Sequence, residues 1–91
     1  MTKEHSLKQL MTIPGIGKSI ANNLYDIGIK SIEDLQGKDP QTLFEESNGY
    51  AGTIQDRCLL YCFRCAVYFS ETEPAERNPE KLKWWNWKDK L

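Results

Sequence analysis

One proline and two glycines near the start of the chain set the strongest constraint on its fold. Pro14 and Gly15 are followed by Gly17, and the apolar Ile16 stands between the two glycines. Proline cannot continue a helix, and glycine adopts backbone conformations that side chains disfavour. The pattern therefore predicts a tight turn between two helices, with Ile16 fixing one side of the turn to a core.

The residues after this turn predict a helix end that can bind an anion. Lys18 and Ser19 stand where the second helix is expected to begin, and there the backbone N–H groups have no helical partners and the helix dipole is positive. Such an end suits a phosphate. We expect Gly15, Gly17, Lys18 and Ser19 to form a phosphate-binding site. The alternative is a structural turn that binds no ligand.

These residues resemble a known DNA-binding motif. Pro14 to Lys18, with the small Ala21 and the apolar Leu24, is similar to the helix-hairpin-helix motif of DNA repair and recombination proteins. Residues 29–43 also resemble the segment that often follows such a hairpin. The resemblance implies non-specific binding to the sugar-phosphate backbone of DNA. It also implies a monovalent-cation site formed by three backbone carbonyls, those of Met11, Ile13 and Ile16.

Nearly the whole chain resembles a small bacterial family of pathogenicity locus, or mitomycin-resistance-like, proteins. Three segments carry this resemblance, namely Asp56 to Cys58, Phe63 to Tyr68 and Leu82 to Asp89. Together with the hairpin, they suggest a bacterial accessory protein linked to DNA repair. Beyond the cation at the hairpin, we expect no cofactor.

Length and composition predict one small domain. The chain has 91 residues, of which 40% are hydrophobic. We expect an all-α fold of five to six helices, because no segment alternates with the period of a strand and helix caps recur. Within residues 1–91, we assign 6–29 to the helix-hairpin-helix unit and 31–70 to supporting helices. Residues 71–91 form a connector and a Trp-rich basic tail.

The charge distribution confines any DNA contact to a few places. The formal net charge is −1, so there is no global basic field to attract nucleic acid. Residues 81–91 carry four lysines and one aspartate, a net charge of +3, whereas residues 1–50 carry a net charge of −2. The expected contacts are therefore the hairpin and the basic tail.

Local sequence signals predict several helix ends. Ser6 and Gln9 have the spacing of a capping box at the start of the first helix. Gly28 follows the second helix and predicts a left-handed C-terminal cap. Asp39 before Pro40 predicts the start of a later helix, because an aspartate cap followed by proline in the first turn is a favoured order.

A long apolar helix is expected over residues 53–69, and it carries all three cysteines. Cys58, Cys62 and Cys65 share one helical face. A metal site would need a fourth ligand, and His5 is the only histidine. Because free cysteine commonly packs as a small hydrophobe, we predict packing and no metal site. A cysteine metal or redox protein is the less favoured alternative.

The chain shows no targeting or membrane signal. Its N-terminus is polar, and its longest apolar run is too short to span a bilayer. With an odd number of cysteines, this predicts a reduced, cytoplasmic setting without membrane contact.

The tail contains three tryptophans within four residues, Trp84, Trp85 and Trp87, flanked by Lys83 and Lys88. These rings could stack on exposed bases while the lysines contact phosphates. They could instead form a protein-binding hot spot, or pack back over the long helix to complete a small core.

The sequence favours a binding protein over an enzyme. It shows no nucleophile with a histidine base and no paired carboxylate site. The leading hypothesis is a non-catalytic accessory module that binds DNA without sequence specificity. The alternative is a protein-interaction adaptor that uses the Trp-rich tail.

Overall fold

The computed structural model describes residues 2–88, and helices make up most of them. Four are α-helices: α1 (Lys3–Leu10), α2 (Lys18–Asp26), α3 (Pro40–Ala51) and α4 (Arg57–Glu71). Four are short 3₁₀ helices: η1 (Glu33–Leu35), η2 (Pro74–Glu76), η3 (Pro79–Leu82) and η4 (Trp84–Trp87). Residues 2–88 contain no strand. The all-α, single-domain prediction is confirmed, but the expected five to six helices are four α-helices with short 3₁₀ segments.

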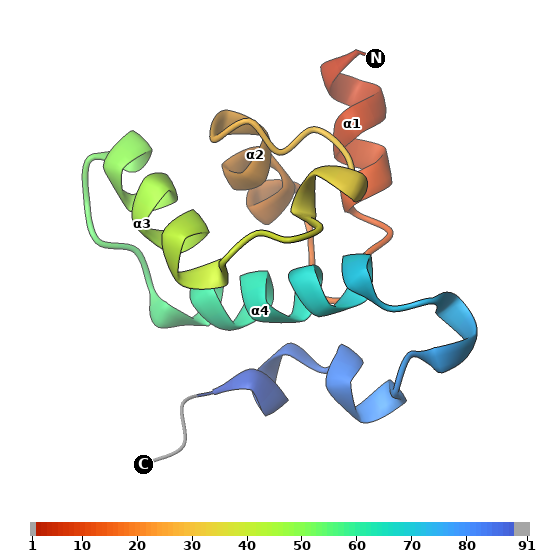
Figure 1. Ribbon diagram of the computed structural model, residues 1–91. Coiled ribbons are helices and arrows are strands. Elements are labelled where there is room, and N and C mark those ends of the chain that lie inside the picture. Colours follow the sequence, from red (N-terminus) through yellow and green to blue (C-terminus); the bar gives the residue numbers. More distant parts are fainter. Residues whose placement is uncertain (1, 89–91) are drawn as a thin grey trace.

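Helix α4 is the central element (Figure 1). The first three α-helices lie on one side of it, and the C-terminal segment with η3 and η4 runs along the other. This position follows from the sequence, because α4 is apolar around most of its circumference and such a helix packs on several sides. Phe63, Cys65 and Ala66 in its middle are fully buried.

The connection between α1 and α2 enters the same core. Ile13 and Ile16 retain only 1% and 4% of their exposure, and they cluster with Leu60 and Phe63 of α4. The two isoleucines therefore fix the turn to the centre of the domain, as the sequence predicted for Ile16.

The end of α2 has the predicted left-handed glycine. Gly28 has φ +94°, its N–H bonds to the Tyr25 carbonyl, and the Ile29 N–H bonds to the Leu24 carbonyl at 3.0 Å. Ile29 then packs in the core. This pair of bonds is the Schellman motif, in which only glycine adopts the required φ without strain.

The start of α3 is also confirmed. The Asp39 carboxylate accepts hydrogen bonds from the Thr42 N–H at 3.2 Å and from the Thr42 hydroxyl at 2.9 Å, with Pro40 in the first turn. Helix α4 begins at Arg57, later than expected, because the Asp56 carboxylate caps it by accepting from the Cys58 N–H at 2.8 Å.

The predicted capping box at Ser6 is wrong. Helix α1 already begins at Lys3, where the Thr2 hydroxyl accepts from the His5 N–H and caps the first turn. Ser6 is consequently buried in the middle of the helix. Gln9 serves another purpose, because its side-chain oxygen accepts from the Ile32 N–H at 3.0 Å and ties α1 to the segment before η1.

Candidate nucleic-acid interface

Residues 11–17, the turn segment, connect α1 to α2. The Ile13 N–H bonds back to the Leu10 carbonyl, and the Ile16 N–H bonds to the Ile13 carbonyl, both at 3.1 Å. Gly15 reverses the chain with φ +84°, a conformation that residues with side chains rarely adopt. The buried isoleucines hold one side of the turn segment, so its other side faces solvent.

The start of α2 leaves backbone donors available. Gly17 is the N-cap residue, and the first helical bond runs from the Ala21 N–H to the Gly17 carbonyl at 2.9 Å. Since no side chain caps this end, the N–H groups of Lys18, Ser19 and Ile20 find no acceptor within residues 2–88. Three aligned donors at a positive helix end form a geometry that accepts an anion.

The four predicted phosphate-binding residues lie together on the surface. Gly15, Gly17, Lys18 and Ser19 are all exposed. The Lys18 side chain forms no ion pair with any other residue between positions 2 and 88. The site therefore combines aligned N–H donors, one lysine ammonium and one hydroxyl.

The fold requires glycine at only one of the two glycine positions of the turn segment. Gly17 has an extended backbone that any residue can adopt, with φ −89° and ψ −175°, and a methyl group added there would meet nothing within 4 Å. Nothing in the described chain therefore requires glycine at this position. Gly15, in contrast, has a positive φ and a close neighbour.

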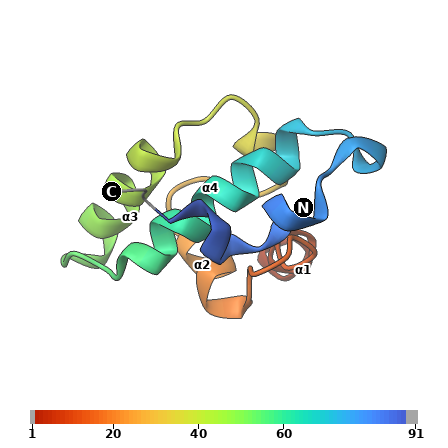
Figure 2. The same cartoon turned by 90° about the horizontal axis from the view of Figure 1, so that it is seen from below.

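That neighbour is Trp84 of η4. A methyl group added at Gly15 would lie 3.1 Å from Trp84 Cδ1, so the indole packs directly against the turn segment. Figure 2, the view from below, shows η4 beside the connection from α1 to α2. Sequence reasoning missed this contact, because residues so far apart carry no periodic or spacing signal of their proximity.

Helix α4 holds the C-terminal segment, residues 79–88, in place. The Arg64 guanidinium donates to the Trp87 carbonyl at 2.8 Å, and the Cys65 thiol donates to the Lys81 carbonyl at 3.6 Å. The Trp87 ring also lies 5.6 Å from that of Tyr68, between centroids. These contacts place Trp87 against α4.

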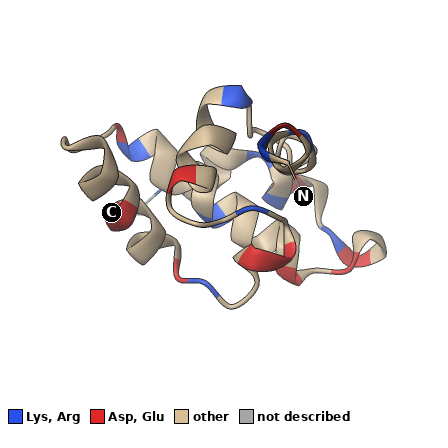
Figure 3. Ribbon diagram, turned by 90° about the horizontal axis from the view of Figure 1, so that it is seen from above, with Lys and Arg blue, Asp and Glu red and all other residues tan. Residues whose placement is uncertain are grey.

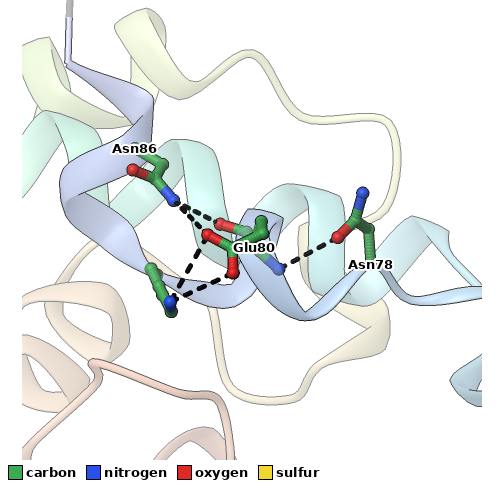
Figure 4. A network of polar contacts seen from close by, with 4 residues as sticks. Asn78, Glu80 and Asn86 are labelled. Carbon is green, nitrogen blue, oxygen red and sulfur yellow. Dashed lines mark hydrogen bonds and ion pairs between the residues drawn. The ribbon is translucent and has the colours of Figure 1, made fainter.

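Glu80 organises the middle of the C-terminal segment (Figure 4). Its backbone N–H bonds to Asn78 Oδ1 at 2.9 Å, and its carbonyl accepts from Asn86 Nδ2 at 2.7 Å. Its carboxylate forms an ion pair with Lys83 Nζ at 3.1 Å. The network links the start of η3 to η4, so the tryptophans between these contacts have defined positions.

The three tryptophans are therefore not equivalent. Trp84 and Trp87 are partly buried, and Trp84 packs against the hydrophobic core, as the packing alternative expected. Trp85 keeps 50% of its exposure. Of the three tryptophans, Trp85 therefore presents the most aromatic surface to a ligand or partner.

Basic and acidic residues are interspersed over the molecule, as Figure 3 shows from above. Arg57 and Arg64 of α4 lie 5.9 and 5.6 Å from the Tyr61 ring centroid, and Arg64 also donates to the Trp87 carbonyl of η4. Asp89 and Lys90, counted in the basic tail from the sequence, lie outside the described residues. An anion-binding surface on the described residues would therefore depend on the local arrangement at the turn segment and not on overall charge.

The turn segment also contains the three carbonyls assigned to a monovalent cation. Ile13 and Ile16 bury their side chains, whereas Met11 is exposed. The Ile13 carbonyl already accepts from the Ile16 N–H. The cation remains a prediction from the family resemblance.

The cysteines do not converge on a metal site. Within the described part of the chain, no group of three or more histidine, cysteine, aspartate or glutamate side chains could hold an ion. Cys62 and Cys65 are buried, and burial raises the pKa of each thiol from 9.0 to about 11. They are therefore protonated and unreactive at neutral pH. Cys58 is exposed.

Comparison with known proteins identifies the family. Residues 3–91 match the family described as "Pathogenicity locus". The chain belongs to the pathogenicity locus family. It is also 33% identical over 78 residues to the mitomycin resistance protein McrB of Streptomyces lavendulae, a match that covers 86% of this chain and 69% of that protein. No solved structure matches the chain.

None of the helices within residues 2–88 combines the length and the apolar character needed to cross a bilayer.

Proposed function

We propose that this protein binds DNA without sequence specificity, with α1, the turn segment and α2 acting as a helix-hairpin-helix. The observation that carries the proposal is the uncapped start of α2, where three N–H groups have no acceptor within residues 2–88 and Lys18 is exposed. Gly17 adds support, because the fold does not require a glycine there. A phosphate that approaches the backbone closely would require one, since any side chain would stand in its way.

The proposed contacts explain why binding would ignore base sequence. A phosphate oxygen would accept hydrogen bonds from the N–H groups of Lys18 and Ser19, while the Lys18 ammonium neutralises charge and the Ser19 hydroxyl donates a further bond. Contacts of this kind position a protein on the backbone and carry no base identity. The protein would act as an accessory module, with no chemical step of its own.

Fluorescence anisotropy with labelled duplex DNA tests the proposal. Binding through two or three phosphates predicts that log Kd changes with log salt concentration with a slope of about 2 to 3. We expect the Lys18→Glu variant to lose at least tenfold in affinity, because it places a like charge beside the phosphate.

Lys38→Glu is the matched control, since Lys38 is also exposed and the change in net charge is the same. Far-UV circular dichroism establishes that both variants are folded. Equal affinity of the two variants at low salt would refute the site at α2. No binding by the wild-type protein at low salt would refute DNA binding altogether.

A second candidate function is protein interaction through the exposed Trp85. Tryptophan is enriched in binding hot spots, and this ring retains half of its exposure. Purification from native cells with and without nuclease separates the two functions, because a protein partner retained after nuclease favours the adaptor.

The similar protein from Streptomyces suggests a biological setting. Its name describes mitomycin resistance, and we propose that the present protein supports the same resistance through its DNA contact, in a repair context. Survival of mitomycin-treated cells expressing wild-type or Lys18→Glu protein tests this. Equal protection by both proteins would separate resistance from the proposed phosphate site.

A further inference from the structure

The exposed indole of Trp85 is linked through Trp84 to Gly15 in the turn segment. Trp84 packs directly against Gly15, and Trp85 stands edge-on to Trp84, with 5.8 Å between ring centroids and an interplanar angle of 88°. The contacts from Gly15 through Trp84 to Trp85 therefore connect the exposed ring to the turn segment that leads into α2.

The chain on both sides of Trp85 is fixed, so the exposure of this ring is imposed by the fold. After it, Asn86 donates to the Glu80 carbonyl at 2.7 Å, and the Trp87 carbonyl accepts from Arg64 at 2.8 Å. Before it, Trp84 is partly buried and packed against the core. A large aromatic ring is thus held half-exposed, with its position set in advance of binding.

An exposed indole beside a phosphate site suits one ligand chemistry particularly well. Nucleobases stack on aromatic side chains, and this interaction tolerates any base because every base has a π-face. Inside a duplex the base faces are already stacked on one another, so an unpaired base offers its face far more readily than a paired one. Lys83 is paired with Glu80 at 3.1 Å, but Lys88, which follows the tryptophans, is exposed and adds a positive charge that suits a polyanionic strand.

We propose that Trp85 stacks on an unpaired base of a DNA strand whose backbone is bound at the start of α2. This inference rests on the proposed function and narrows its substrate to DNA with unpaired nucleotides next to a duplex, such as overhangs, gaps and forks. Trp84 is a positioning residue in this arrangement, because it touches the turn segment and supports the Trp85 ring.

Anisotropy titration with two DNAs of equal charge tests the inference. One is a blunt duplex, and the other has the same number of nucleotides arranged as a shorter duplex with a single-stranded overhang. We expect the wild-type protein to prefer the overhang by about fivefold or more. Trp85→Ala should remove this preference while leaving affinity for the blunt duplex unchanged, and Trp85→Phe should retain part of it.

A 2-aminopurine placed in the overhang reports stacking directly. We expect its fluorescence to be quenched by the wild-type protein and unquenched by Trp85→Ala. Tyr50→Ala is the matched control, because Tyr50 is another exposed aromatic, at 68%, and belongs to α3, on the opposite side of the molecule from α1 in Figure 1. It should leave both the preference and the quenching intact.

The outcomes separate this inference from the function on which it rests. Lys18→Glu should weaken binding to both DNAs, whereas Trp85→Ala should affect only the overhang. If Trp85→Ala keeps the preference and the quenching, or weakens binding to both DNAs equally, the stacking role is overturned and the exposed ring is free to serve a protein partner. If the wild-type protein binds neither DNA, the proposed function and this inference both fail.

Discussion

At the residue scale, the two glycines of the turn segment differ, because the fold requires glycine at only one of the two positions. Gly15 is required by the fold, because its φ is +84° and Trp84 lies against it. Gly17 adopts an extended backbone in open space. A pattern of two glycines in the sequence predicts a turn, but it does not distinguish these reasons.

The difference predicts unequal effects of two matched substitutions on the free energy of unfolding. Gly15→Ala should destabilise the protein by about 1–3 kcal/mol, because a side chain at positive φ is strained and its methyl group would meet Trp84. Gly17→Ala should change stability by less than about 0.5 kcal/mol, since the weaker helix cap is offset by the lower entropy of the unfolded chain.

Urea denaturation followed by circular dichroism measures both values under the same conditions. Equal losses for the two variants would contradict the assignment of separate roles to Gly15 and Gly17.

At the element scale, α4 organises the domain by packing on both of its sides. Its two buried thiols must stay protonated to remain buried, because burial disfavours the charged thiolate. Burial raises the pKa of Cys62 and Cys65 to about 11, while the same thiols in the unfolded chain titrate near 9.0.

These shifts predict a loss of stability at alkaline pH. Between pH 9 and 11 the unfolded state releases the two protons while the folded state retains them, so the free energy of unfolding falls as the pH rises. Below about pH 8 the two thiols should contribute almost no pH dependence, because they are then protonated in both states. Urea denaturation at steps from pH 8 to 11 measures the slope.

The double variant Cys62→Ala, Cys65→Ala is the control for the thiols, because it keeps every other titratable group of the chain. Its stability should fall less steeply above pH 9 than that of the wild type. Parallel slopes in the two proteins would show that the buried thiols are not responsible.

Helix ends were predictable from the sequence where a single short-range signal marked them, and the start of α1 was not, because Thr2 and Ser6 both offer a local cap there. Asp39 and Gly28 act on their own helix termini, so the sequence predicted both. The Ser6 and Gln9 pair failed because Thr2 caps α1 earlier and Gln9 bonds to Ile32, far along the chain.

At the scale of the whole molecule, the candidate interface joins two segments from opposite ends of the chain. The phosphate-binding residues were predictable because they are contiguous and lie in a turn with a known resemblance. Their neighbour Trp84 was not, because its contact with Gly15 depends on how α4 holds the C-terminal segment. The tryptophan cluster itself was visible in the sequence, but the exposure of Trp85 alone required the structure.

The central claim is that DNA contacts the start of α2, and an NMR titration tests it most directly. In ¹H–¹⁵N spectra of the labelled protein, adding duplex DNA should shift the backbone amides of Gly17, Lys18 and Ser19 more than those of α3. These shifts should diminish as salt is added, because the bound groups are phosphates. Large shifts confined to the connection between α3 and α4, with unchanged amides at the start of α2, would contradict the account.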